Sequence, residues 1–504
     1  MFFPDLAEFR RRCKRGNLIP VYTEIPADIE TPVSAFLKIA HKAKCAFLLE
    51  SVAGGDKISR YSFLGADPTE MITVKGGIVE HTVSGKTKIL SHQGDPLKIL
   101  RRLMRRYKIV AAKDDLPPFH GGAVGYLNYD LVRYFERLPK KNPDEIDLPE
   151  ASLIFTENLL VFDHVKHTIK IVSNVHVTGK TELAYQRALR CIRQLAKKLQ
   201  APLPPKNKPK LKGKKVRLKS NVTKEDFLAK VRRCKEYIKA GDIFQVQISQ
   251  RLSTKSDLPP FDVYRALRTV NPSPYMFYLR FKEGELIGAS PEQLVSREDK
   301  KVMTRPIAGT IHRDLDKIKD KKLEERLLSD PKEQAEHIML VDLGRNDLGR
   351  VCRYGTVNVP DLMEIERYSH VMHIVSQVEG KIAPGYDEFD VLKAAFPAGT
   401  VTGSPKIRAM EIIEEMETTR RGPYAGAVGY FDYTGNFDSA ITIRTIVYTK
   451  GYYHLQAAAG IVADSRPEKE YQETLNKMQA LIKALELANQ GWPYQIKSNI
   501  KKRG

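Results

Sequence analysis

The chain has 504 residues, of which 42% are hydrophobic and 29% charged, a composition typical of a folded globular protein. No apolar run approaches the roughly 20 residues that span a bilayer, and the stretch from Met1 to Arg12 lacks the apolar core of a signal peptide. The 83 basic and 61 acidic residues give a net charge of +22, but much of the excess lies in Lys206–Lys219 and Lys497–Arg503, which indicates solvated segments rather than a nucleic-acid-binding groove.

Five cysteines lie far apart and form no Cys-x-x-Cys pair: Cys13, Cys45, Cys191, Cys234 and Cys352. Their odd number and irregular spacing fit neither a disulfide framework nor a zinc site. A reducing compartment follows as the default, so we expect a cytoplasmic protein.

The first part of the chain combines short strand-like runs with one late helix. Apolar runs predict strands at Cys45–Leu49, Leu153–Phe162 and Thr168–Val172, and a helical pattern covers Glu182–Leu199.

Lysine and proline then dominate, which marks a linker. We therefore predict an N-terminal region over residues 1–200, a Lys/Pro-rich linker over 201–220, a second domain over 221–490 and a basic tail over 491–504.

The second part begins with a helix whose two ends are marked. Lys224–Ala240 is amphipathic, Thr223 can cap its N-terminus, and Gly241 can end it. Five strand-like runs follow, with helices between them: Phe244–Ser249, Tyr275–Phe281, Ala425–Phe431, Ile441–Tyr448 and Tyr453–Ala459. Their irregular order and hairpin-like turns predict an α+β fold with antiparallel sheets rather than a doubly wound one.

Two glutamates three residues apart, Glu333 and Glu336, fall on one face of a predicted helix. The helix is apolar on nearly every side from Ala335 to Leu343, which predicts burial. A buried carboxylate is costly unless it is paired or binds a cation. Glu333 can also close a capping box with Asp330, whereas Glu336 has no such structural role.

A second pair, Glu470 and Glu473, shares a helical face with Lys477, and Ser465 with Glu468 is spaced as a capping box ahead of it. Taken alone, this pair is more typical of a solvated charged face. Two oxygen-only pairs without nearby histidine clusters suit a hard cation such as Mg²⁺, which leaves room for substrate oxygens.

A loop rich in glycine and threonine, Phe396–Lys406, precedes a predicted helix over Pro405–Met416. Such a loop either binds an anion at the helix N-terminus or only caps the helix, and the Walker A order is absent. The glycine-rich segments at 422–430 and 457–460 either approach a ligand or pack tightly within strands.

In order and wording, these motifs resemble those of the chorismate-utilising enzymes, most closely the anthranilate synthase component I family. The resemblance covers residues 221–489 and rests on separate segments at 288–292, 305–310, 336–347, 370–373, 399–406, 421–424 and 443–444, and on Glu470 with Glu473. It implies large antiparallel sheets with surrounding helices, and an Mg²⁺-dependent lyase that converts chorismate and ammonia to anthranilate and pyruvate in tryptophan biosynthesis.

The resemblance also implies roles around the cation and the substrate. Glu336 and Glu473 would bind Mg²⁺, with Glu333 and Glu470 close behind through bound water. Arg444 and Tyr424 would hold the enolpyruvyl carboxylate, a task suited to a guanidinium fork. The substrate-binding residues that it implies are Gly399, Tyr424, Arg444, Ala458, Gly460 and Lys477, although family enzymes often carry glycine in place of Ala458.

Catalytic roles fall on four residues. Glu292 would protonate the departing C4 hydroxyl, which requires a raised pKa. His373 would serve pyruvate elimination, and Thr400 would lie near the ring. Gln245 stands where isochorismate and salicylate synthases carry a water-activating lysine, so ammonia is the expected nucleophile.

A further difference concerns Ala308, where many aminodeoxychorismate synthases carry a nucleophilic lysine. Amination at C2 without a covalent enzyme intermediate then follows, which leads to the ortho-amino product. Aminodeoxychorismate synthase component I is the alternative within the family. A basic nucleic-acid-binding protein is an alternative of another class, but the chain has no recognisable motif of that kind.

The N-terminal part resembles the regulatory region of the family. Two segments resemble the halves of a tryptophan feedback pocket, namely Leu49, Glu50 and Ser51, and Pro274, Tyr275 and Met276. The first segment alone could be no more than a strand end and a turn; the two together predict inhibition by tryptophan.

The source of ammonia is the last implication. None of the cysteines lies in the Gly-x-Cys-x-Gly setting of a glutaminase nucleophile. The resemblance therefore implies a separate glutamine amidotransferase subunit, and so a hetero-oligomer that binds neither nucleic acid nor membrane.

Overall fold

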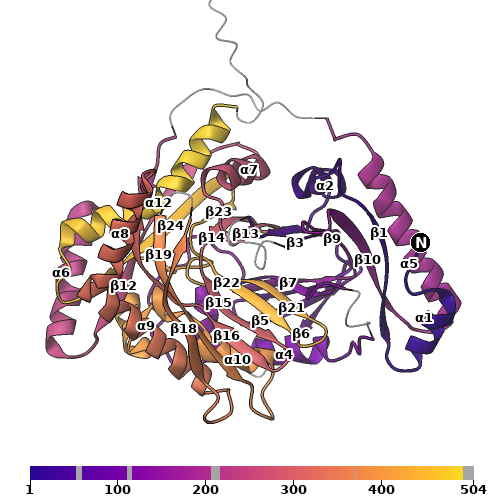
Figure 1. The fold of residues 1–504 in the computed structure, drawn as a ribbon, viewed down its shortest axis with the longest axis horizontal. Coiled ribbons are helices and arrows are strands. Elements are labelled where there is room, and N and C mark those ends of the chain that lie inside the picture. The colour runs from indigo at the N-terminus through magenta and orange to yellow at the C-terminus, as the bar shows by residue number, and fades with distance from the viewer. Residues whose placement is uncertain (53–59, 93, 111–115, 206–215, 369–370, 492–504) are drawn as a thin grey trace, which may run out of the picture.

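Two large antiparallel β-sheets form the centre of the molecule, and helices surround them (Figure 1). The computed structural model describes residues 1–52, 60–92, 94–110, 116–205, 216–368 and 371–491. Within these ranges no helix is long and apolar enough to cross a lipid bilayer. The predicted α+β class is confirmed.

The first sheet has the strand order β1-β10-β9-β3-β2-β13-β14-β23-β24-β12-β11, with β20 also paired to β12. Its strands are β1 (Leu18–Pro26), β2 (Ala46–Glu50), β3 (Tyr61–Ala66), β9 (Asn158–Asp163), β10 (Thr168–His176), β11 (Lys219–Ser220), β12 (Gln245–Lys255), β13 (Tyr275–Arg280), β14 (Glu285–Ser290), β20 (Gly403–Ser404), β23 (Thr445–Thr449) and β24 (Tyr452–Ile461).

The second sheet has the order β17-β19-β16-β15-β22-β21-β7-β8-β4-β5-β6, with β18 also paired to β19. Its strands are β4 (Glu70–Lys75), β5 (Ile78–Val83), β6 (Lys86–Leu90), β7 (Gly122–Leu127), β8 (Ala151–Thr156), β15 (Gln293–Glu298), β16 (Lys301–Thr304), β17 (Ile307–His312), β18 (Asn358–Arg367), β19 (Val371–Lys381), β21 (Ala427–Asp432) and β22 (Phe437–Ile441).

The α-helices include α6, whose first and last residues agree with the prediction. They are α1 (Leu6–Cys13), α2 (Pro32–Ile39), α4 (Pro96–Met104), α5 (Thr181–Gln200), α6 (Lys224–Ala240), α7 (Pro260–Val270), α8 (Lys317–Ser329), α9 (Pro331–Gly349), α10 (Glu388–Ala395), α11 (Lys406–Met416) and α12 (Pro467–Asn489). At the start of α6 the Thr223 hydroxyl accepts the N–H of Asp226 at 3.1 Å, and Gly241 ends the helix at φ +83°. Both predicted ends of this helix are confirmed, because local capping chemistry determines them.

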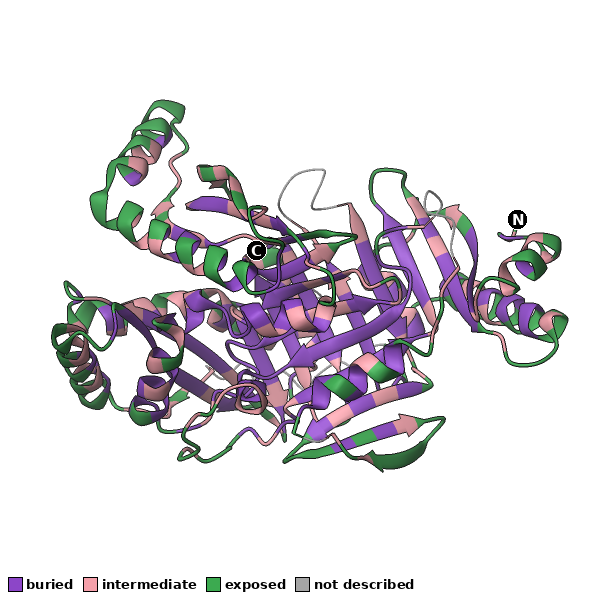
Figure 2. Cartoon of the chain, turned by 90° about the horizontal axis from the view of Figure 1, so that it is seen from below, coloured by how far each residue is buried: buried purple, intermediate pink, exposed green. Residues whose placement is uncertain are grey.

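Strands from both sides of the Lys/Pro-rich segment are paired to each other in both sheets. β2 pairs with β13 in the first sheet, and β7 pairs with β21 in the second. A shared core, which includes Phe47, Val161, Val124 and Val428, takes side chains from both sheets (Figure 2). The domain bounds remain a prediction, and residues 206–215 and 492–504 of the predicted linker and tail lie outside the described residues.

Two runs that were each predicted to be one strand are two strands in the structure. The run Leu153–Phe162 contains two strands, because the chain passes from β8 in the second sheet to β9 in the first at Glu157. The run Ile441–Tyr448 is interrupted between β22 and β23, where Arg444 has φ +50°. Polar residues mark both breaks, Glu157 and Asn158 in the first run and Arg444 in the second, but apolar residues resume directly after them, so each run was read as one strand.

Two expectations about helices were also wrong. α9 is buried on one side only, and Ile338 keeps 39% of its surface exposed. The N-cap of α12 is Arg466 with Pro467 at the first turn, so Ser465 and Glu468 form no capping box. The Ser465 hydroxyl instead accepts the N–H of Val462 at 3.0 Å.

Candidate active site

Carboxylates of α9 and α12 face one another. Burial and then the negative charges of Glu336, Asp330 and Glu473 raise the pKa of Glu333. Burial, together with the charge of Glu473, also raises the pKa of Glu470. Two helices that are far apart in sequence therefore bring their predicted glutamates together. Across the described part of the chain, however, no three His, Cys, Asp or Glu side chains are grouped as a ready-made metal site.

Asp330 caps α9 without the capping box that the sequence allowed for Glu333. Its carboxylate accepts the N–H groups of Lys332 and Glu333. The side chain of Glu333 turns instead toward Gly309, where an added Cβ would lie 3.1 Å from Glu333 Oε2. The Glu333 carboxylate thus lies between α9 and β17, on the side of α9 that faces the sheet.

Glu336 and Glu473 each have a fixed polar neighbour. Gln245 Nε2 donates to Glu336 Oε1 at 2.8 Å, and Lys477 Nζ lies 2.6 Å from Glu473 Oε1. Lys477 Nζ also donates to the carbonyl of Ala458 at 3.0 Å, so this backbone group contacts the site through its oxygen. A Cβ on Gly460 would lie 2.8 Å from Gln245 Nε2, which explains the glycine at that position.

The Glu292 carboxyl is buried, and its surroundings favour the uncharged, protonated form. Burial raises its pKa to about 8, and only 6% of the residue is exposed. The Thr400 hydroxyl, the N–H of Ile307 and the charge of Lys477 act in the opposite direction. Thr400 approaches the carboxyl without the geometry of a full hydrogen bond. Glu292 is therefore mostly protonated at pH 7, as a general acid must be.

Arg444 links the substrate-side residues. Its pKa is lowered by burial, while the charges of Tyr424 and Glu473 act on it in the other direction. Its guanidinium donates to the carbonyl of Lys477. Arg444 lies in the break between β22 and β23, where its φ is +50°.

His373 lies close enough to Arg444 to be affected by its charge. Its pKa is lowered, first by burial and also by the charge of Arg444. Its Nδ1 lies 3.1 Å from the carbonyl of Gly309 and 2.9 Å from Thr310 Oγ1, and its ring contacts Tyr368. In the tautomer with its proton on Nδ1, His373 donates to the Gly309 carbonyl, and Nε2 can then exchange a proton with a reacting group.

Arg421 lies in the segment 421–424 that resembles the family, but the sequence indicates no role for it. It is 1% exposed and pairs with Glu417 at 2.7 Å. It also donates to the carbonyls of Val401 and Gln247, and its guanidinium lies 5.6 Å from the ring centre of Tyr424. Arg421 thus fixes both Tyr424 and the loop that carries Thr400. The Glu-x-x-x-Arg spacing before Gly422-Pro423 was the available signal.

The two predicted halves of the inhibitor pocket lie on adjacent strands. Met276 of β13 pairs with Glu50 of β2, and Ser51 follows directly. Glu50 is buried, accepts from the Tyr264 hydroxyl, and binds Arg268 at 3.1 Å. Its carboxylate therefore has structural partners already.

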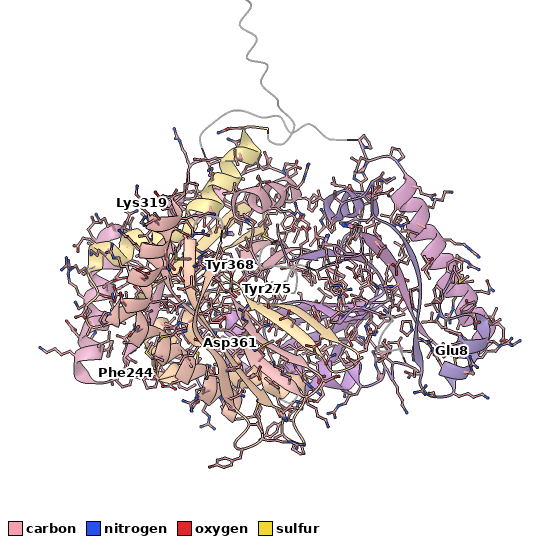
Figure 3. The ribbon with its side chains drawn as sticks, viewed as in Figure 1. Glu8, Phe244, Tyr275, Lys319, Asp361 and Tyr368 are labelled. Carbon is pink, nitrogen blue, oxygen red and sulfur yellow. The ribbon has the colours of Figure 1, made fainter. Side chains whose placement is uncertain are left out.

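Tyr275 lies near the centre of the molecule (Figure 3). Its hydroxyl accepts from Gln293 Nε2 at 2.9 Å, and Gln293 is the residue after Glu292. Tyr275, a predicted inhibitor-binding residue, therefore contacts the residue next to Glu292, the predicted general acid. Residues 53–59, which begin two positions after Ser51, lie outside the described residues.

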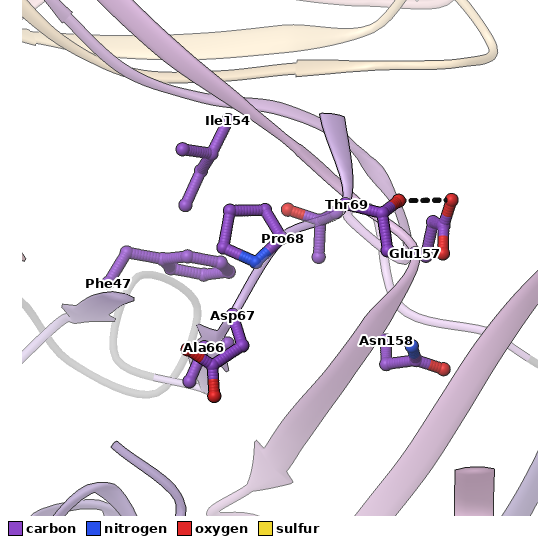
Figure 4. A pocket seen from close by; sticks show the side chains of 10 residues that line it. Phe47, Ala66, Asp67, Pro68, Thr69, Ile154, Glu157 and Asn158 are labelled. Carbon is purple, nitrogen blue, oxygen red and sulfur yellow. Dashed lines mark hydrogen bonds between the residues drawn. The ribbon is translucent and has the colours of Figure 1, made fainter. Parts of the chain in front are cut away.

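Two small hollows in the molecule are lined by different groups of residues. A hollow of about 20 Å³ between Phe47 and Ile154 lies where the chain passes between the sheets, and Thr69 there hydrogen-bonds to Glu157 (Figure 4). A second, of about 30 Å³, is lined by Glu292, Thr400, Gly399 and Leu343. Each can hold one or two water-sized molecules, but only the second opens onto predicted catalytic residues.

Comparison with known proteins agrees with this arrangement of motifs. The model of the chorismate binding enzyme family matches residues 45–483. The chain belongs to this family. Among curated relatives, anthranilate synthase component 1 of Acetivibrio thermocellus is 48% identical over 97% of this chain and 100% of its own length. Its counterpart from Thermus thermophilus is 49% identical over 92% of this chain and 97% of its own length.

Solved structures of family members share the fold. Anthranilate synthase component I from Streptococcus pneumoniae aligns with a TM-score of 0.77 at 36% identity, covering 91% of this chain and 99% of that one. The isochorismate synthase MenF of Escherichia coli aligns with a TM-score of 0.70 at 19% identity, over 95% of this chain and 98% of that one, which supports the fold alone. The predicted membership in the anthranilate synthase component I group is confirmed.

Proposed function

We propose that this protein is the chorismate-converting component of an anthranilate synthase. In the proposed reaction, chorismate and ammonia give anthranilate, pyruvate and water. The observation that carries the proposal is the environment of Glu292. Its carboxyl is buried and largely protonated, and it lies beside Thr400 and near the positive charge of Lys477. An acid in this state can protonate a leaving hydroxyl at neutral pH.

In the first step, ammonia forms a bond to C2 of the ring while the C4 hydroxyl leaves as water. Glu292 supplies the proton that the hydroxyl needs. Arg444 and Tyr424, which lie together through Arg444's interaction with the Tyr424 side chain, would bind the enolpyruvyl carboxylate. Lys477 would add positive charge near the dianionic substrate.

In the second step, the C2 proton and the enolpyruvyl group leave, the ring becomes aromatic, and pyruvate is released. His373 supports this step by geometry, because its bond to Gly309 leaves Nε2 to exchange a proton. The charge of Arg444 helps to lower the pKa of His373 and so favours its neutral form.

The donor set around Glu336 and Glu473 fits Mg²⁺, a hard cation that prefers carboxylate oxygens. Burial first, and then the charges of neighbouring carboxylates, raise the pKa of Glu333 and Glu470 behind them, a cost that a bound cation would relieve. Glu336 and Glu473 would hold the ion directly, and the bound ion would draw electron density from the ring carboxylate.

Three further parts of the proposal concern partners and place. Ammonia would come from glutamine through a separate amidotransferase subunit in a hetero-oligomer. Tryptophan would bind at Leu49–Ser51 and Pro274–Met276 and inhibit the reaction. The reaction would take place in the cytoplasm.

Aminodeoxychorismate synthase is the alternative, and Ala308 argues against it. Ala308 is 9% exposed on β17 and has no amine with which to form a covalent intermediate. Product identity separates the two activities.

The test is product analysis of the purified chain with chorismate, an ammonium salt and Mg²⁺, with and without EDTA. We expect anthranilate and pyruvate in equal amounts, lost on chelation, and abolished by Glu336→Gln or Glu473→Gln in a folded protein. Aminodeoxychorismate as the end product would replace the proposed function by the alternative. Full turnover in EDTA, or in both variants, would remove the cation site.

A further inference from the structure

His373 is flanked by a paired strand on each side. On β19 it lies directly opposite Thr310 of β17 and directly opposite Glu366 of β18. Residues that lie opposite one another on neighbouring strands project to the same face of a sheet. The side chains of Thr310, His373 and Glu366 therefore share one face, with the predicted catalytic histidine in the middle.

The neighbours on β17 restrain one atom of the imidazole. Nδ1 of His373 lies 2.9 Å from Thr310 Oγ1 and 3.1 Å from the carbonyl of Gly309. Contacts at one ring atom do not fix the plane of an imidazole, because its χ2 torsion is broad. The orientation of the ring therefore depends on a second contact.

Tyr368 makes that second contact from the side of β18. Its ring centre lies 5.6 Å from that of His373, and the ring planes meet at 66°, an edge-to-face arrangement. Tyr368 follows the last residue of β18, and its N–H donates to the carbonyl of Val371, the first residue of β19, at 2.8 Å. Tyr368 lies near the middle of the molecule (Figure 3).

Two further side chains hold Tyr368 in place. Its hydroxyl donates to Glu366 Oε2 at 2.9 Å, and Glu366 Oε1 accepts from the guanidinium of Arg305. Arg305 lies two residues before β17, whereas Glu366 lies on β18. This chain of contacts therefore joins the strand on one side of His373 to the strand on the other.

Glu366 also acts on His373 through its charge. Burial lowers the pKa of His373 first, the charge of Arg444 lowers it further, and the negative charge of Glu366 raises it. An imidazole that takes up a proton becomes a cation, and a nearby carboxylate stabilises that form. Glu366 thus opposes the effect of Arg444 on the same ring.

We propose that Tyr368 and Glu366 are positioning residues that prepare His373 for the second step of the reaction. The proposal rests on the proposed function. In that step the C2–H bond and the ether bond to the enolpyruvyl group break, and the C2–H electron pair completes the aromatic ring. The departing enolate of pyruvate takes up a proton at its methylene carbon. His373 can carry a proton in this step only if Nε2 faces the reacting atoms, which requires a fixed ring plane.

The experiment measures how the product divides between anthranilate and the aminated intermediate that still carries the enolpyruvyl group. The purified full chain is supplied with chorismate, Mg²⁺ and an ammonium salt, and both compounds are separated by chromatography and identified by mass. The variants are Tyr368→Leu, which removes the ring, Tyr368→Phe, which keeps it, and Glu366→Gln. Glu364→Gln, at an exposed carboxylate on the same strand, is the matched control.

For Tyr368→Leu we expect the ratio of anthranilate to intermediate to fall about tenfold or more, because a misplaced catalytic group slows its own step. Tyr368→Phe should recover most of that ratio, and Glu364→Gln should equal the parent. Glu366→Gln should lower the ratio and move the pH dependence of the second step to lower pH, since loss of the negative charge lowers the pKa of His373. Glu366→Gln keeps the side-chain volume, so it tests the proposal even if Tyr368→Leu does not fold.

A residue that only fastens β18 to the sheet would slow both steps alike and leave the division of products unchanged. The same ratio in the parent, Tyr368→Leu and Glu366→Gln would therefore overturn the proposal. A parent chain that forms neither anthranilate nor the aminated intermediate would instead be a failure of the proposed function, and the two results are distinct.

Discussion

Gln245 on β12 donates a hydrogen bond of 2.8 Å to Glu336 on α9, and so joins the strand edge to the helix that carries the first carboxylate pair. Gln245 is 1% exposed, and its position requires the glycine at 460. From the sequence, Gln245 was notable only because it replaces a water-activating lysine. In the structure it also orients a predicted Mg²⁺ ligand.

Replacing Gln245 by methionine should weaken activation by Mg²⁺ roughly tenfold or more, because side chains that hydrogen-bond to a ligand carboxylate hold it in place. The Mg²⁺ concentration at half-maximal activity measures the effect. Gln247→Met is the matched control. An added Cβ on Gly460 would lie 2.8 Å from the Gln247 amide, as it would from that of Gln245, but the hydrogen bond to Glu336 comes from Gln245. An equal shift in both variants would assign the effect to packing.

Glu292 predicts an alkaline limit to activity. Its pKa is raised to about 8, so the acid form predominates at neutral pH and is lost as the pH rises through 8. The ammonium-dependent rate, corrected for the fraction of free ammonia, should fall above that pH. Glu292→Gln should remove the activity at every pH, and a fully active variant would exclude Glu292 as the acid.

The same group predicts a pH dependence of stability. The folded-state pKa of Glu292 lies above its ordinary value of 4.5, so its stabilising contribution is complete below about 4.5 and is lost as the pH rises through about 8. Thermal unfolding of the parent chain should become easier relative to Glu292→Gln over that interval. Parallel melting curves for the two proteins from pH 5 to 9 would contradict the assignment.

Gly399 and Leu343 should be coupled. Gly399→Ala places a Cβ 1.8 Å from Leu343 Cδ2, and overpacking of this kind costs about 1–3 kcal/mol. It should also lower turnover, because Thr400 follows directly on the displaced loop. Adding Leu343→Ala removes the clashing atoms, so the double variant should regain much of the stability lost by Gly399→Ala. Additive losses in chemical denaturation would show that the two side chains do not meet.

Ser51 tests the proposed inhibitor pocket. Ser51→Leu should raise the tryptophan concentration needed for half inhibition at least about tenfold, as expected when a side chain fills a binding pocket, and should leave the uninhibited rate near that of the parent. Ser329→Ala, on exposed α8, is the control. An unchanged inhibition curve would move the pocket elsewhere.

Local chemistry in the sequence determined several features without help from the tertiary structure. Thr223 and Gly241 defined α6 to the residue, because capping depends on neighbours within one helical turn. The i, i+3 spacing placed Glu333 with Glu336, and Glu470 with Glu473, on single helix faces. The order of motifs was enough to identify the family.

Only the tertiary structure decided which of these groups meet. The pairing of β2 with β13 brings Glu50 to Met276, and the packing of α9 against β17 and β19 leaves Glu336 within hydrogen-bond distance of Gln245 on β12, across 91 residues of sequence. The raised pKa of Glu292 arises from burial between segments that are distant in the chain. The exposed face of α9 could not be predicted either, because an apolar helix surface has the same sequence pattern whether it is buried in the chain's own core or exposed.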